Sequence, residues 1–213
     1  MSKSSSQPFA NEHKPPEMSR GYFARVSSMR TVIHKFLDNH TVNSKPQCQI
    51  ISIGAGYDTM YFNLSDEGKL PLKYIEMDFM RVISSKIRLI KSKKALLEKI
   101  QLESKPIDIV VSDVTDEAPS LFKLPTSTVP SAMSSIQPGK DLITPQYSLV
   151  SVDLRNLDEL DKKLKECQLN RDLPTLIIAE CVLIYMSSHY SSDLLCHLSK
   201  SFRQCCFLNY EQV

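Results

Sequence analysis

The chain has 213 residues, a formal net charge of +2 and six cysteines. This length can bury one substantial core, and the near-neutral charge gives no reason to expect nucleic acid or an acidic membrane as a partner. The cysteines form no CxxC pair and have no zinc-like spacing, which indicates reduced thiols in a cytoplasmic protein without a metal site. No segment approaches the roughly 18 apolar residues of a membrane span, and we expect a monomer.

Apolar patterning predicts helices and strands that alternate along the chain. In chain order the predicted elements are a helix over 20–37, a strand over about 48–53, a short helix near 61–64, a strand over 73–78, a helix over 82–102, a strand over 147–153, a helix over 157–167, a strand over 174–180, a helix over 189–202 and a strand over 206–213. This alternation predicts an α/β fold with a mostly parallel sheet.

Three further segments are interpreted from composition. Residues 1–15 have no apolar core and are expected to form a disordered leader. A stretch rich in Pro, Ser and Thr, about 104–147, has no periodicity and is expected to be a flexible insertion within a domain over 16–213. The lysine run from Lys86 to Lys99 is interpreted as a solvated helix face rather than a phosphate-binding site.

The first strand is followed by a glycine turn typical of ligand-binding loops. Gly54 and Gly56 let the backbone turn sharply and approach a ligand without interference from Cβ. Asp58 and Thr59 are residue types that begin a helix. Because structural turns use the same residues, this loop alone leaves a ligand site and a structural turn equally open.

Carboxylates stand at the ends of the strands that follow. The second strand ends in Glu76 and Asp78, the third in Asp153, and the fourth in Glu180. In open parallel sheets, ligands bind beyond the carboxyl ends of the strands. The glycine loop and these carboxylates would then share one edge, which predicts a binding site there.

The residue types at this edge favour an adenosine ligand without phosphates. Glu76 and Asp78 lie 20 and 22 positions past Gly56 and suit ribose hydroxyls, while Asp153 suits the adenine amine. The third glycine of a dinucleotide loop and the lysine of a triphosphate loop are both missing. S-adenosylmethionine is therefore the natural candidate, with its ammonium near Glu180 and its carboxylate near a cation such as Arg25.

Several motifs together resemble the leucine carboxyl methyltransferase family. They are Arg20–Val26, Ile53–Thr59, Tyr74–Phe79, Val152–Arg155, Ile178–Met186 and Phe207–Val213. The resemblance implies an S-adenosylmethionine-dependent methyltransferase fold of Rossmann-like type. It also implies that the enzyme forms a methyl ester on the C-terminal leucine of the protein phosphatase 2A catalytic subunit, whose C-terminal tail would be the partner.

The resemblance also implies roles at the cofactor. Arg25 would pair with the carboxylate of the methionine moiety, and Gly54 with Gly56 would leave room for the cofactor. Asp78 would hold the ribose, with Glu76 as its neighbour on the same face.

The adenine and the reacting end would be held by later residues. Asp153 and Leu154 would frame the adenine, and Glu180 would lie near the methionine amino group or the sulfonium. Tyr185 would line the same cavity, with a core tyrosine as the alternative. Arg20 or Arg25 would steer the anionic end of the substrate.

The family continues through further strands, so the chain is expected to be a partial methyltransferase domain with its C-terminal strands missing: a fragment, a splice form or an incomplete gene model. Two alternatives to the phosphatase methyltransferase remain. One is the related carboxyl methyltransferase of the tRNA wybutosine pathway. The other is a truncated, non-catalytic form that only binds cofactor or phosphatase.

Overall fold

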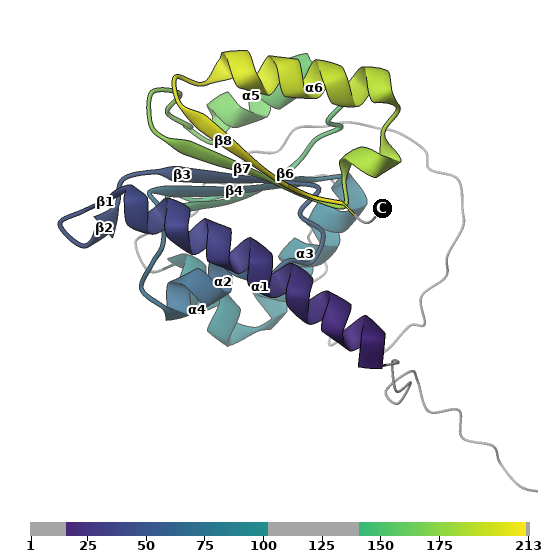
Figure 1. The fold of residues 1–213 in the computed structure, drawn as a ribbon. Coiled ribbons are helices and arrows are strands. Elements are labelled where there is room, and N and C mark those ends of the chain that lie inside the picture. The colour runs from purple at the N-terminus through teal and green to yellow at the C-terminus, as the bar shows by residue number, and fades with distance from the viewer. Residues whose placement is uncertain (1–15, 102–140, 212–213) are drawn as a thin grey trace, which may run out of the picture.

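A six-stranded sheet forms the centre of the computed structural model, which describes residues 16–101 and 141–211 (Figure 1). Its strands are β5 (Leu142–Ile143), β6 (Tyr147–Ser151), β4 (Lys73–Asp78), β3 (Gln49–Ile53), β7 (Thr175–Glu180) and β8 (Cys205–Tyr210), in spatial order. All neighbours pair in parallel except β5, which runs antiparallel to β6. The predicted α/β fold with a mostly parallel sheet is confirmed.

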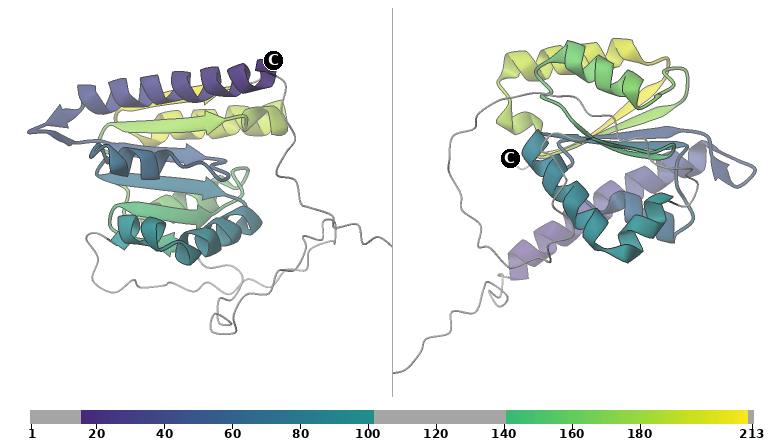
Figure 2. Two further views of the ribbon diagram at one scale, coloured as in Figure 1. Left: turned by 90° about the horizontal axis from the view of Figure 1, so that it is seen from below. Right: turned by 180° about the vertical axis from the view of Figure 1, so that it is seen from behind.

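Helices cover both faces of this sheet (Figures 1 and 2). On one face lie α1 (Pro16–Asn39), α2 (Met60–Asp66), α3 (Met80–Ser92) and α4 (Lys94–Gln101), and on the other lie α5 (Leu157–Glu166) and α6 (Ser188–Ser201). Among the residues that the structure describes, no helix combines the length and the apolar character needed to cross a membrane.

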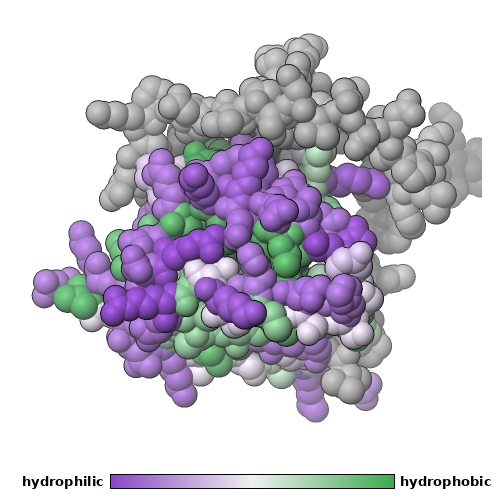
Figure 3. All heavy atoms as spheres, turned by 90° about the horizontal axis from the view of Figure 1, so that it is seen from above, coloured by the Kyte–Doolittle hydropathy of each residue, from purple (hydrophilic) through white to green (hydrophobic). Residues whose placement is uncertain are grey.

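The strands contribute side chains to two separate cores, because successive side chains of a strand point to opposite faces of the sheet. Ile50 of β3 packs with α1, α2 and α3, whereas its neighbour Ile51 packs with α5 and α6. Burial on both faces explains why the strands read as continuous apolar runs. Figure 3 shows the outer surface over α5 and α6, where hydrophilic side chains predominate, as expected of helices that face solvent.

One predicted helix differs from the structure. The helix predicted over 82–102 is two helices, because Lys93 adopts an extended backbone with φ −114° and ψ 103° between α3 and α4. The turn brings α4 back beside α2 and keeps Ile100 in the core. Lys86, predicted to lie on a solvated face, is instead buried.

Two other segments also differ from the prediction. Residues 141–147 of the predicted insertion belong to the sheet, where they form β5 and the turn into β6, while the remainder of that insertion and the predicted leader lie outside the described residues. A two-stranded hairpin of β1 (Thr41–Val42) and β2 (Lys45–Pro46) was not predicted. Its turn uses Asn43 and Ser44 at positive φ, in place of the glycine that usually signals such a turn.

Candidate functional site

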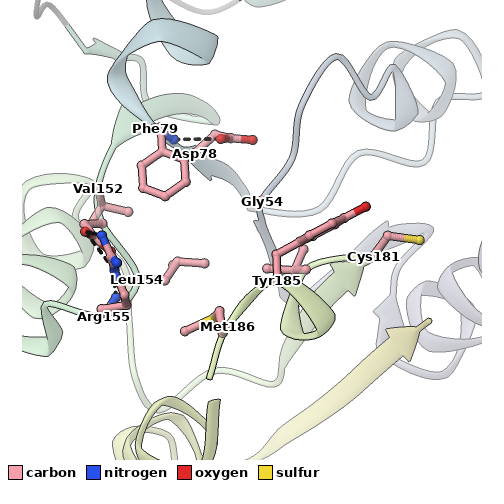
Figure 4. Close-up of a pocket in the computed structure, with 11 residues that line it drawn as sticks. Gly54, Asp78, Phe79, Val152, Leu154, Arg155, Cys181, Tyr185 and Met186 are labelled. Carbon is pink, nitrogen blue, oxygen red and sulfur yellow. Dashed lines mark hydrogen bonds and ion pairs between the residues drawn. The ribbon is translucent and has the colours of Figure 1, made fainter. Parts of the chain in front are cut away.

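The carboxyl ends of β3, β4, β6 and β7 meet at one edge of the sheet. There Ile53 pairs with Met77 on one side and Ala179 on the other, and Asp78 pairs with Ser151. A cavity of about 290 Å³ opens at this edge (Figure 4). Its lining residues are Gly54, Asp78, Phe79, Val152, Asp153, Leu154, Arg155, Cys181, Val182, Tyr185 and Met186.

The glycine loop needs both of its glycines, for different reasons. Gly54 and Gly56 have φ values of 60° and 51°, which L side chains rarely adopt. A Cβ on Gly54 would also lie 2.5 Å from Cγ2 of Val182, so the space beside Gly54 is filled by the chain itself. Among the described residues, apart from the chain neighbours of Gly56, no heavy atom lies within 4 Å of a Cβ placed on Gly56. Packing against Val182 therefore accounts for Gly54 as directly as a ligand does.

Asp78 fixes the glycine loop to the end of β4. Its Oδ2 accepts a hydrogen bond from the backbone N–H of Gly56 at 2.8 Å, and its Oδ1 accepts one from the N–H of Phe79 at 2.7 Å. Each carboxylate oxygen has a second lone pair, so Asp78 can still accept hydrogen bonds from a ligand in the cavity that it lines.

Asp153 and Leu154, predicted to frame an adenine ring, both line the cavity. The Asp153 carboxylate accepts hydrogen bonds from Nε of Arg155 at 2.9 and 3.1 Å, and these bonds hold the pKa of Asp153 below its ordinary value. The side chains of Phe79, Leu154 and Met186 face the cavity from three different segments (Figure 4). The cavity is therefore apolar, with carboxylates at its rim.

Arg25 and Glu180 form an ion pair with each other. The pair is partly buried and joins α1 to the end of β7, and the Arg25 guanidinium lies 5.5 Å from the ring centroid of Tyr210. Neither residue lines the cavity, but Cys181, which follows Glu180, does. The structure thus brings together the two residues predicted to hold the two ends of one zwitterion.

The predicted ligand role of Glu76 is wrong. Its side chain is 0% exposed, does not line the cavity and forms an ion pair with Lys86 of α3. Burial raises the pKa of the Glu76 carboxyl to about 7, although Lys86 opposes the shift. Glu76 and Asp78 do share a face of β4, but Glu76 lies one step inside the fold and is covered by α3.

The structure separates the last two predicted residues. Tyr185 is 84% exposed and lines the cavity, so the alternative of a core tyrosine is excluded. Arg20 is exposed on α1 and does not line the cavity. The prediction missed the apolar lining residues Phe79, Val182 and Met186, although all three lie inside or next to the quoted motifs.

Fold and site together define a class of protein. A parallel α/β sheet carries, at its carboxyl edge, a glycine loop, strand-end carboxylates and an apolar cavity, which is the arrangement of cofactor-binding α/β proteins. In the part of the chain that the structure describes, no group of three or more His, Cys, Asp or Glu side chains could hold a metal ion.

Comparison with known proteins identifies the family. The leucine carboxyl methyltransferase family model matches residues 1–199. Leucine carboxyl methyltransferase 1 of Rattus norvegicus is 39% identical over 204 residues, covering 96% of this chain and 52% of the relative, and that of Caenorhabditis elegans is 38% identical, covering 92% and 50%. The chain belongs to the leucine carboxyl methyltransferase family and spans about half the length of these relatives.

A second group of relatives is less similar. tRNA wybutosine-synthesizing protein 4 of Rattus norvegicus is 28% identical over 202 residues, covering 94% of this chain and 25% of the relative. In both groups the match covers more than nine-tenths of this chain.

Proposed function

We propose that this protein is an S-adenosylmethionine-dependent carboxyl methyltransferase and that the cavity at the sheet edge is its cofactor site. The observation that carries the proposal is the glycine loop hydrogen-bonded to Asp78 at the mouth of an apolar cavity. Membership of the leucine carboxyl methyltransferase family supports it. The proposed substrate is the C-terminal leucine carboxylate of the protein phosphatase 2A catalytic subunit.

The residues present fit this cofactor. Leu154, Phe79 and Val152 provide apolar walls for an adenine ring, and Asp78 provides lone pairs for ribose hydroxyls. Arg25 and Glu180 carry the charges complementary to the carboxylate and the ammonium of a methionine moiety. In the proposed complex each of the two would exchange its present partner for one end of that zwitterion.

The reaction depends on positioning of the two reactants more than on acid–base catalysis. When bound, the cofactor supplies a methyl group activated by a sulfonium. A peptide carboxyl group, with a pKa of about 3.5, is already ionised at neutral pH, so no general base is needed. The chain must hold the two reactants in line and exclude water.

The residues predicted to act at the reacting end of the cofactor are Glu180, Tyr185 and Arg20, and their positions support different roles. We assign Glu180 to the methionine ammonium, next to the reacting sulfonium. Tyr185 lines the cavity and is exposed, so we place it at the entrance used by the substrate. Arg20 does not line the cavity, and we assign it long-range attraction of the anionic tail.

The test has a binding stage and a turnover stage. Calorimetry of the purified chain with S-adenosylmethionine should show saturable binding, and a chain that binds none contradicts the proposal. Labelled cofactor is then offered with phosphatase 2A core enzyme, with the same enzyme lacking its C-terminal leucine, and with the wybutosine tRNA precursor. We expect label only on the intact phosphatase. Label on the tRNA would favour the wybutosine alternative, and binding without turnover the non-catalytic one.

A further inference from the structure

A buried ion pair lies directly beneath the glycine loop. The side chains of Lys86 on α3 and Glu76 on β4 are only 4% and 0% exposed. The ammonium of Lys86 donates one hydrogen bond to the Glu76 carboxylate and another, at 2.7 Å, to the backbone carbonyl oxygen of Asp58 in the loop. Lys86 therefore connects the core of the sheet to the segment that carries Gly54 and Gly56.

Stability alone does not explain this pair. Removing two charges from water is costly, and apolar residues of similar volume often stabilise a core at least as well as a buried ion pair. What apolar residues cannot replace is the hydrogen bond from Lys86 to the Asp58 carbonyl.

The loop is held at several points, and Lys86 holds its end. The N–H of Ala55 donates to the carbonyl of Met77 at 3.0 Å, and the N–H of Gly56 donates to Asp78. Beyond them, Oδ1 of Asp58 accepts the N–H groups of Thr59 and Met60, which begin α2. Because Lys86 fixes the carbonyl of Asp58 itself, it sets where the glycine turn ends and where α2 begins.

We propose that Glu76 and Lys86 are positioning residues for the glycine loop: Glu76 holds the ammonium of Lys86 in place, and Lys86 holds the loop in its ligand-binding shape. Neither residue lines the cavity, so both act through the loop. The inference deepens the proposed function, on which it rests for the identity of the ligand. The geometry of the loop itself can be tested without any ligand.

The test uses the double variant Glu76→Gln/Lys86→Met, which removes both charges and leaves no unpaired charge in the core. Hydrogen exchange of the loop amides over residues 54–60 should become faster by roughly tenfold or more, the effect of losing one hydrogen bond to a charged donor. Exchange in β3 and β4 should stay slow. Affinity for S-adenosylmethionine, measured by calorimetry, should fall by about the same factor.

The buried ion pair of Asp141 with Lys163 serves as a matched control. Its side chains are 8% and 9% exposed, and it does not contact the glycine loop. Its double variant Asp141→Asn/Lys163→Met should leave loop exchange and affinity unchanged. If the Glu76/Lys86 variant does not fold, Glu76→Gln alone serves, with a smaller loss of loop protection. Wild-type loop exchange in a folded variant would overturn the inference. Faster exchange in a chain that binds no S-adenosylmethionine would keep it and overturn only the proposed function.

Discussion

The Asp78 carboxylate has two roles: it accepts hydrogen bonds from two backbone N–H groups, and it lines the cavity. We predict that Asp78→Ala weakens S-adenosylmethionine binding by roughly tenfold or more, since both a ribose acceptor and the anchor of Gly56 are lost. Calorimetry measures the affinity. Asp66→Ala, which removes an exposed carboxylate paired with Lys99, is the control and should bind normally. An unchanged affinity in Asp78→Ala would rule out the ribose role.

Glu76 should make stability depend on pH in the direction opposite to that of a solvent-exposed carboxylate in an ion pair. Burial raises its folded-state pKa to about 7, and Lys86, Asp58 and Tyr147 are the ionisable groups that face it. The folded state then binds more protons than the unfolded state between about pH 4.5 and 7, so the stability that this group contributes is lost as the pH rises through that window.

The measurement compares wild type with Glu76→Gln by urea unfolding at about pH 5 and about pH 8. The free energy of unfolding of wild type, relative to the variant, should fall by roughly 1–3 kcal/mol between the two. A difference that rises with pH would contradict the prediction, because it would show that attraction to Lys86 outweighs the effect of burial on the Glu76 carboxyl.

At the scale of elements, the loop after β3 and the turn after β7 fit together at Gly54 and Val182. We predict that Gly54→Ala lowers the free energy of unfolding by about 2–4 kcal/mol, from strain at positive φ and from the clash with Val182. Gly56→Ala, with the same sign of φ and open space, should cost only about 1 kcal/mol. Urea unfolding measures both.

A double-mutant cycle separates the two contributions to that cost. Val182→Ala removes the methyl groups that a Cβ on Gly54 would meet, so Gly54→Ala should cost less in the Val182→Ala background than alone. If the changes in the free energy of unfolding of the two single variants are strictly additive, backbone strain accounts for the whole effect of Gly54→Ala.

The strands and the residues at their carboxyl ends were predictable from the sequence where an apolar run ends in a glycine or a carboxylate, as at Gly54, Asp78 and Asp153. The burial of Lys86 was not, because one lysine within a basic run looks like the others until α3 is placed against β4. The ion pair of Arg25 with Glu180 depends on how α1 crosses the end of β7, which no local pattern encodes. Short pairings such as β1 with β2 carry too few residues for a periodic signal.

At the scale of the whole molecule, residues from both faces of the sheet meet at its carboxyl edge. The glycine loop is connected through Lys86 to the face covered by α1–α4, whereas Leu154 belongs to the core under α5 and α6 and Val182 packs against that core. The cavity lies between these groups, so a ligand that fills it contacts both layers of the fold. Binding should therefore stabilise the domain as a unit rather than one loop.

This expectation leads to a prediction for thermal unfolding. A ligand at about 100 times its dissociation constant stabilises the folded state by about 2.7 kcal/mol, which corresponds to a rise in Tm of roughly 5–10 °C for a domain of this size. S-adenosylmethionine and its demethylated product should both raise the Tm, because they share the adenosine and the zwitterionic end. ATP should not, since the loop has neither the third glycine nor a lysine to hold phosphates. A shift with ATP as large as with S-adenosylmethionine would show a general nucleotide site at this edge of the sheet, in place of one specific for the methyl donor.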